Sequence, residues 1–300
     1  MKIALSGARG RLGCIIRRHF EAQGCEVFAL SRNADAHHLP LGYLPHLLVQ
    51  NPPDVLIHMA WSTVPSSAES NPGTEWYNDL PLLSEMLRDV DARRIQTNRP
   101  THLVFFSSCA VYGEPTKPSD VLDEHCKPSP IGWYARGKAH AEQLIEAFSD
   151  RGNPAAVLRV TNPYGFAQDA RCLQGVIPAL VRAAVTGNEF SMWGGGDAVK
   201  DYLHISDLCR AVECVVRSRL QGTYNVAAGR SVSLGDLVGM VEEITNRTVE
   251  CRAAPAAPWD VRSGRYSHQA LTAATGWKPS VDLAEGLRAL VRLLAEVLTP

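Results

Sequence analysis

Long apolar runs and an excess of charge of either sign are both absent from this sequence. No apolar run in its 300 residues approaches the roughly 18 residues that a membrane-spanning helix needs. The formal net charge of −1 gives no general electrostatic reason to expect binding to nucleic acid or to an anionic membrane. The apolar stretch between Met1 and Gly7 is too short for a signal peptide. We therefore expect a cytoplasmic protein with no nucleic-acid or membrane partner.

Cysteine and histidine patterns that would indicate a disulfide framework or a zinc site are also missing. None of the eight cysteines forms a C-x-x-C pair, and the ten histidines include the neighbours His37 and His38 but no H-E-x-x-H. A chain of this length needs no covalent cross-links to be stable. We expect no metal site and mostly buried, reduced cysteines.

What the sequence does contain is an alternation of short apolar runs with helical patterns over its first two-thirds. Such alternation is typical of an α/β protein whose parallel sheet is covered by helices on both faces. The expected strands are Lys2–Ser6, Glu26–Leu30, Asp54–His58, His102–Ser107 and Ala155–Val160, and the expected helices span about 11–23, 41–49, 72–94 and 129–148.

After Gly165 the pattern predicts a smaller, mixed α/β lobe at the C-terminal end of the chain. Residues 166–202 and 229–300 would form this lobe, and residues of about 203–228 would return to the first unit, residues 1–165. The expected helices here span about 173–186, 206–217, 231–246 and 283–298, with strands near 189–193 and 222–226.

A glycine-rich loop, Gly7-Ala8-Arg9-Gly10-Arg11-Leu12-Gly13, lies between the first expected strand and the first helix. Its glycines permit positive φ and close backbone approach, and the start of a helix favours a pyrophosphate group. The loop predicts a Rossmann-type doubly wound sheet in which residues 1–165 plus about 203–228 bind a dinucleotide, while the C-terminal lobe binds the substrate. The loop residues expected to contact the cofactor are Gly7, Arg9, Gly10, Arg11, Leu12 and Gly13.

The end of the second expected strand favours NADP(H) over NAD as the dinucleotide. An acidic residue there would accept the ribose 2′-hydroxyl of NAD, whereas an arginine suits the 2′-phosphate of NADP. Here the strand ends in Ser31 and Arg32, and no carboxylate follows until Asp35. Arg9 could supply a second positive charge, because the planar fork of an arginine matches phosphate. NAD stays open, because Arg32 could equally be a solvated surface residue.

Tyr134 and Lys138 stand one helical turn apart in the helix expected from Ser129, which would be its N-cap with Pro130 at the first position. An ammonium about 4 Å from a phenolate interacts with it by roughly 4 kcal/mol at an effective dielectric of about 20. That attraction would favour the phenolate by about three pKa units, before desolvation takes part of it back. We expect Lys138 to lower the pKa of Tyr134, so that the phenol can exchange a proton with an alcohol or sugar oxygen. By itself the spacing is weak evidence, because Tyr-x-x-x-Lys occurs by chance in many helices.

Further ordered motifs indicate which family the sequence resembles. They are Asp54–Ala60 on the third strand, Asn78 on the next helix, Phe105–Gly113 with the pattern S-S-x-x-V-Y-G, Arg159–Gly165, Lys200–Asp207 and Gly276–Pro279. With the glycine loop and the Tyr134–Lys138 pair, they resemble the extended short-chain dehydrogenase/reductase family. Within that family they resemble the nucleotide-sugar branch of epimerases, dehydratases and 4-ketoreductases, which includes the UDP-glucose 4-epimerases.

The resemblance implies chemistry at C4 of a hexose that is attached to a nucleoside diphosphate. Tyr134 would exchange a proton with the C4 oxygen, Ser108 would hydrogen-bond and fix that oxygen, and Lys138 would hold the nicotinamide ribose. The dinucleotide would carry the hydride, which side chains cannot do. The resemblance also implies a homodimer formed by the helices expected at 72–94 and 129–148. It further implies cofactor contacts at Ala60 and Asn78 and substrate contacts at Ser108, Cys109, Asn162, Lys200 and Arg262.

The sequence departs from the family's pattern at several substrate-facing positions. The 4,6-dehydratases need an acid and a base directly after the catalytic hydroxyl, where this chain has Cys109 and Ala110. We therefore expect no 4,6-dehydration. Lys200 replaces the family's arginine, and Ala257-Pro258-Trp259-Asp260 replaces an R-x-G-D phosphate clamp, so Arg262 or Arg265 would have to supply the charge.

Two catalytic interpretations share these residues, and a third needs no catalysis. The Ser31–Arg32 strand end favours an NADPH-dependent 4-keto-sugar reductase, which consumes its cofactor. The first alternative is an NAD-dependent 4-epimerase of the UDP-glucose or UDP-N-acetylglucosamine type, which would retain its cofactor through a cycle. The second alternative is a non-catalytic NADP-binding regulator, although such a protein would be expected to lose its proton-transfer groups.

Overall fold

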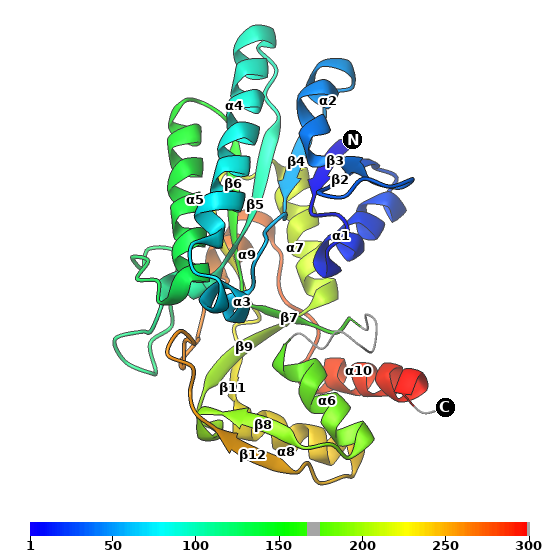
Figure 1. Cartoon of the computed structure of the whole chain (residues 1–300), viewed down its shortest axis with the longest axis vertical. Helices are drawn as coiled ribbons and strands as arrows, with labels where there is room; N and C mark the ends of the chain where they lie inside the picture. Colours follow the sequence, from blue (N-terminus) through cyan, green and yellow to red (C-terminus); the bar gives the residue numbers. More distant parts are fainter. Residues whose placement is uncertain (167–174, 299–300) are drawn as a thin grey trace.

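The computed structural model of the protein describes residues 1–166 and 175–298 (Figure 1). Within them, a seven-stranded sheet runs in the order β10-β6-β5-β4-β1-β2-β3, and every neighbouring pair of strands is parallel. The chain moves outward from β1 first in one direction and then in the other, which is the Rossmann-type doubly wound arrangement that the sequence predicts. The strands are β1 (Lys2–Ser6), β2 (Glu26–Ser31), β3 (Leu39–Pro40), β4 (Val55–His58), β5 (His102–Ser108), β6 (Ala155–Val160) and β10 (Gly222–Val226).

The strands form where the short apolar runs lie, because helices cover both faces of the sheet. β6 is buried at every position, and β5 at every position but its last. The five strands expected in the first two-thirds of the chain are confirmed to within one residue at each end. The two-residue β3 is an addition at the sheet edge that the pattern does not indicate.

Two sets of helices sandwich this sheet (Figure 1). One face packs against α2 (Leu44–Gln50), α4 (Leu80–Thr97) and α5 (Gly132–Asp150). The other face packs against α1 (Arg11–Ala22), α7 (Ile205–Ser218) and α9 (Gln269–Thr275). Residues from both ends of the sequence therefore share one core.

A second core lies below the sheet in Figure 1, beyond the carboxyl ends of its strands. Three helices build it, and the start near residue 173 that the sequence predicts for the first of them lies outside the described residues. The helices are α6 (Val176–Thr186), α8 (Leu234–Thr245) and α10 (Leu283–Leu298). They pack with a three-stranded sheet of β11 (Ser231–Ser233), β9 (Val199–His204) and β7 (Asn162–Tyr164), and with the pair β8 (Phe190–Trp193) and β12 (Cys251–Ala254).

The start of α5 differs from the sequence prediction. The helix begins at Gly132 rather than at Ser129, and Ile131 before it is extended (φ −100°, ψ 147°). Ser129 lies three residues before the helix, where its amide donates to the Val111 carbonyl at 3.0 Å. The prediction of a Ser129–Pro130 N-terminus is therefore wrong, and another group must serve the first amides of α5.

The segment before α4 holds two elements that the hydrophobic pattern does not reveal. One is the short helix α3 (Pro65–Ser70), and the other is a π-helical turn over Glu75–Asp79, which stands where an ordinary helix start at residue 72 is expected. In the described part of the chain, no helix is both long and apolar enough to cross a membrane.

Candidate active site

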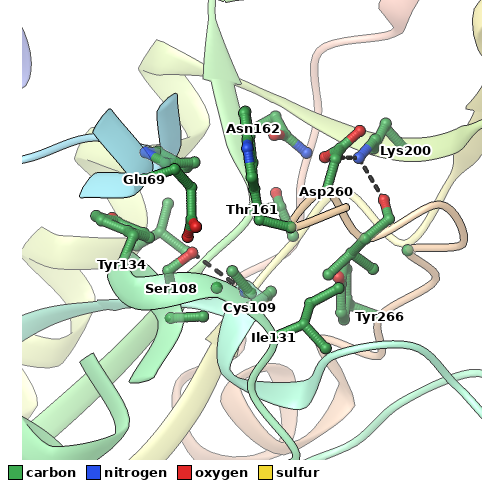
Figure 2. A pocket seen from close by; sticks show the side chains of 18 residues that line it. Glu69, Ser108, Cys109, Ile131, Tyr134, Thr161, Asn162, Lys200, Asp260 and Tyr266 are labelled. Carbon is green, nitrogen blue, oxygen red and sulfur yellow. Dashed lines mark hydrogen bonds and ion pairs between the residues drawn. The ribbon is translucent and has the colours of Figure 1, made fainter. Parts of the chain in front are cut away.

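A cavity of about 110 Å³ lies where the carboxyl ends of β5 and β6 meet the C-terminal lobe. Ligands bind in the crevice at the carboxyl ends of the strands in open α/β sheets. Figure 2 shows its side chains converging from both units of the fold. Those that carry chemistry are Glu69, Ser108, Cys109, Tyr134, Asn162, Lys200, Asp260 and Tyr266.

Ser108 and Tyr134 share one wall of this cavity. Ser108 ends β5, and its hydroxyl accepts the Ala110 amide at 3.2 Å, which fixes the side chain at the start of the following turn. Tyr134 lies in the first turn of α5, and a hydrogen bond from the Ser108 side chain partly stabilises its ionised form. The structure thus brings together two residues that are 26 positions apart and that the sequence assigns to one oxygen of the substrate.

Lys138 lies one turn further along α5 but is buried behind the cavity wall. Its ammonium donates to the Phe106 carbonyl at 2.7 Å and lies 3.8 Å from the centre of the Trp61 ring. Burial lowers the pKa of Lys138 to about 7, although the carboxylates of Asp79, Glu142 and Glu75 act in the opposite direction.

The expected acidification of Tyr134 by Lys138 is wrong for this structure. The pKa of Tyr134 is raised to about 12, first by burial and then by the negative charges of Glu75 and Asp79. The lysine ammonium lies 5.9 Å from the tyrosine ring centre and is occupied by a backbone carbonyl. Burial, together with two carboxylates that are distant in the sequence, therefore raises the pKa of the phenol.

Glu75 and Asp79 come from the π-helical turn and are both buried. Glu75 accepts a hydrogen bond from the Thr63 hydroxyl, and its Oε2 has no partner in the parts of the chain that the structure describes. Asp79 accepts the Ser62 amide at 2.9 Å, and burial raises the pKa of its carboxyl group. Glu75 reaches α5 because residue 137 is glycine: a Cβ there would stand 2.7 Å from the Glu75 Cγ.

The glycine loop has the backbone geometry that a dinucleotide needs. Gly7 has φ +76°, and a Cβ on it would lie 2.7 Å from the amide nitrogen of Ala60. A Cβ on Gly13 would lie 2.1 Å from the Gly7 carbonyl oxygen, so the loop and the first turn of α1 pack without side chains between them. The start of α1 also carries no side-chain cap. These residues fit a bound dinucleotide, whose phosphates a helix N-terminus favours.

The residues expected to distinguish NADP from NAD cluster at the end of β2. Arg32 is exposed, whereas the Ser31 hydroxyl turns back to donate to the Asn33 carbonyl at 2.8 Å. Arg9 from the glycine loop also lies near the end of β2, and its Nη1 is 3.5 Å from Oδ2 of Asp35. Both an arginine pair and a carboxylate are thus present. Asn78, the other expected cofactor residue, is exposed on the π-helical turn and is not part of the cavity wall.

The far end of the cavity contains an ion pair rather than a free cation. Lys200 on β9 lies 2.6 Å from Asp260 and also donates to the Val261 carbonyl. Asn162 lines the same end and donates to the Asp201 carbonyl at 2.9 Å. Arg262 does not line the cavity; its guanidinium is exposed and reaches the Gly194 carbonyl at 3.4 Å.

Cys109 lines the cavity floor as a buried thiol. It donates to the Arg159 carbonyl at 3.1 Å. Burial raises the pKa of this thiol well above its usual value, and the negative charge of Asp201 adds to the effect. The thiol therefore stays protonated at neutral pH.

Glu69 is a cavity residue that sequence reasoning missed. It lies on α3, and its Oε1 accepts the Trp133 amide at 2.6 Å, which satisfies a backbone donor in the first turn of α5. Pro65 at the first position of α3 could have indicated this helix. No local pattern, however, would place the Glu69 carboxylate beside Tyr134.

Known proteins share the sequence pattern and the fold of this chain. The chain matches the family model described as NAD dependent epimerase/dehydratase family over residues 3–227. It is 26% identical over 263 residues to a UDP-glucose 4-epimerase of Rhizobium leguminosarum bv. trifolii, covering 82% of this chain and 78% of the relative. It is also 26% identical to a GDP-6-deoxy-D-mannose reductase of Pseudomonas aeruginosa, covering 80% and 79%.

A solved structure shares the whole fold. The UDP-glucose 4-epimerase of Thermus thermophilus, in complex with NAD, superposes with a TM-score of 0.85 at 25% identity. The match covers 97% of this chain and 98% of the other. The same arrangement of sheet and lobe thus holds a dinucleotide in that protein.

Proposed function

This chain belongs to the NAD dependent epimerase/dehydratase family, and we propose that it is an NADPH-dependent reductase of 4-keto sugars attached to a nucleoside diphosphate. The observation that carries the proposal is the pair of Ser108 and Tyr134 on one cavity wall, at the end of β5 and the start of α5. The Tyr134 phenol is protonated at neutral pH and can give its proton to a carbonyl oxygen as that oxygen becomes an alcohol, although its raised pKa makes it a weaker acid.

Each side chain has a separate role at the carbonyl oxygen of the substrate. Tyr134 donates the proton, and the Ser108 hydroxyl hydrogen-bonds the same oxygen and holds it within reach. Lys138 orders the cofactor ribose beside the cavity and offers its positive charge close to the reacting oxygen. A bound dinucleotide supplies the hydride, for which the protein has no group of its own.

The preference for NADPH is supported by the charges at the end of β2. Arg32 has no hydrogen-bond or ion-pair partner among residues 1–166 and 175–298, so its guanidinium is available to a 2′-phosphate. Arg9 lies at the same end of the strand, held by Asp35. An arginine pair suits the dianionic phosphate better than the neutral ribose of NAD.

We also propose that the protein does not dehydrate its substrate. Elimination across C5 and C6 needs an acid and a base beside the catalytic hydroxyl. Cys109 stands there with its thiol pKa raised, and the alanine at position 110 has no group that titrates.

A 4-epimerase is the second candidate, and Asp35 is the observation that favours it. Its carboxylate lies at the end of β2, where an acidic residue would accept the ribose hydroxyls of NAD. An epimerase would keep its dinucleotide bound and would need Tyr134 to work in both directions.

Incubation of the purified protein with a 4-keto nucleotide sugar and NADPH separates the two candidates. A reductase consumes one NADPH for each alcohol formed, which is followed through the nicotinamide absorbance. Interconversion of two nucleotide sugars without added cofactor, together with release of NAD on denaturation, would contradict the reductase and support the epimerase.

A further inference from the structure

Glu69 places a carboxylate on the wall of the cavity that holds Ser108 and Tyr134. Figure 2 shows its carboxylate turned into the cavity above Ser108. One of its oxygens, Oε1, is held by the Trp133 amide at 2.6 Å. The other oxygen, Oε2, has no hydrogen-bond or ion-pair partner in the part of the chain that the structure describes.

The other charged groups of the cavity do not neutralise this carboxylate. Lys200 is paired with Asp260 at 2.6 Å and also donates to a backbone carbonyl. The side chains of the described cavity wall therefore carry two carboxylates and one ammonium, and the unbalanced negative charge is that of Glu69.

A bound sugar would displace water from Oε2 and must replace the hydrogen bonds that the water made. An ionised carboxylate only accepts hydrogen bonds, so the group facing it has to be a donor. An ammonium satisfies this need best, because its opposite charge adds an electrostatic attraction that a neutral hydroxyl donating to the same carboxylate lacks. A second carboxylate in the same place offers no donor and repels the first.

We propose that Glu69 determines the specificity of this site by selecting an amino sugar, accepting a hydroxyl less well and rejecting a uronate. The inference rests on the proposed function, because it assumes that C4 of the sugar lies at Ser108 and Tyr134. The substituents nearest to C4 are those on the ring carbon C3 and on the exocyclic carbon C6. We therefore expect the ammonium of the preferred sugar at one of these two positions.

The substitution Glu69→Gln separates this role from that of a helix cap. The amide oxygen of glutamine can still accept the Trp133 N–H, so the start of α5 keeps its partner. The amide nitrogen then faces the cavity as a donor and the negative charge is gone. If Glu69 acted only as a helix cap, the wild-type and Glu69→Gln proteins would have the same ligand preferences.

The test measures dissociation constants by titration calorimetry at neutral pH for ligands that differ in one group. UDP-glucose is compared with its 3-amino and 6-amino derivatives and with UDP-glucuronate, and the series is repeated with thymidine diphosphate as the carrier. For the wild-type protein we expect one of the amino derivatives to bind about tenfold tighter than UDP-glucose, because its ammonium adds ion-pair attraction to the hydrogen bond. UDP-glucuronate should bind about tenfold more weakly than UDP-glucose.

In Glu69→Gln both differences should shrink to less than about threefold, because neither ion-pair attraction nor charge repulsion remains at this position. Glu85→Gln is the matched control, because it removes an exposed carboxylate on α4 that does not line the cavity and should leave the preference for the amino derivative in place. A wild-type protein that binds all four ligands alike, or none of them, overturns the inference, as does a Glu69→Gln protein that keeps the wild-type order.

These outcomes are independent of the proposed reaction, since binding needs no turnover. A protein that shows the expected order of affinities but neither reduces nor epimerises any sugar contradicts the proposed function alone. A protein that reduces a 4-keto sugar while Glu69→Gln leaves all affinities unchanged contradicts the specificity inference alone.

Discussion

The Lys138 ammonium lies 3.8 Å from the centre of the Trp61 indole ring, inside the protein and one helical turn from Tyr134. An aromatic face attracts a cation but does not replace its hydration, so burial still penalises the charge. The pKa of Lys138 is accordingly lowered to about 7. This lysine therefore titrates close to neutrality, more than three units below its usual value of 10.5.

Binding of the dinucleotide should weaken as the pH rises through about 7, where Lys138 loses its proton. The ammonium is the form that donates to ribose hydroxyls, and it is the populated form only below that pKa. Dissociation constants for NADPH, measured by fluorescence about one unit below and one unit above this pH, check the prediction. Lys138→Met should bind more weakly and without this pH dependence. A wild-type affinity that stays flat across the interval would count against the lysine's role.

Replacement of Gly137 by alanine should destabilise the protein. A Cβ at this position would stand 2.7 Å from the Glu75 Cγ and 2.8 Å from its Cβ, and neither atom is the end of a flexible chain. Overpacking of this kind costs typically about 1–3 kcal/mol. Gly239→Ala is the control, because residue 239 is also helical and a Cβ there meets no atom within 4 Å. That variant should gain about 0.5–1 kcal/mol. Urea unfolding of both variants gives their free energies of unfolding. Equal effects of the two substitutions would show that the Glu75 side chain moves aside at little cost.

Loss of the Arg32 guanidinium should lower the affinity for NADPH while leaving that for NADH nearly unchanged. A charge-assisted contact to a phosphate is worth about 1.5–3 kcal/mol, which corresponds to about tenfold or more in the dissociation constant. Arg32→Ala is compared with Arg88→Ala, which removes an exposed arginine from α4 and alters the net charge equally. A wild-type protein that prefers NADH, or an Arg32→Ala protein that loses both cofactors alike, would contradict the assignment of NADPH.

Much of the fold follows from the sequence because its strands are buried on both faces. β5 and β6 are largely apolar, and their ends lie within a residue of the predicted ones. The first turn of α5 is different. A serine followed by proline is a good local cap signal, but Ile131 is still extended, and Glu69 from another helix accepts the Trp133 amide instead.

The parts of the site that sequence reasoning missed all depend on contacts between distant residues. Lys200 and Asp260 are 60 positions apart, so their ion pair has no local signal. The sequence predicts the pKa of Tyr134 from its nearest charged neighbour in the helix, whereas burial, and after it Glu75 and Asp79 from the π-helical turn, raises that pKa. The domain boundaries, the homodimer and the cytoplasmic location stay predictions.

Turnover by the Tyr134→Phe protein tests the central claim most directly, because the substitution removes one hydroxyl and leaves the ring in place. With a 4-keto nucleotide sugar and NADPH, we expect kcat to fall by about a hundredfold or more, the usual contribution of a positioned general acid. The affinity for NADPH should change by less than about threefold, since no charged group is lost. Tyr77→Phe, which alters a tyrosine that is 81% exposed, should match the wild-type protein. A Tyr134→Phe protein that keeps more than about a tenth of the wild-type turnover would contradict proton transfer by Tyr134.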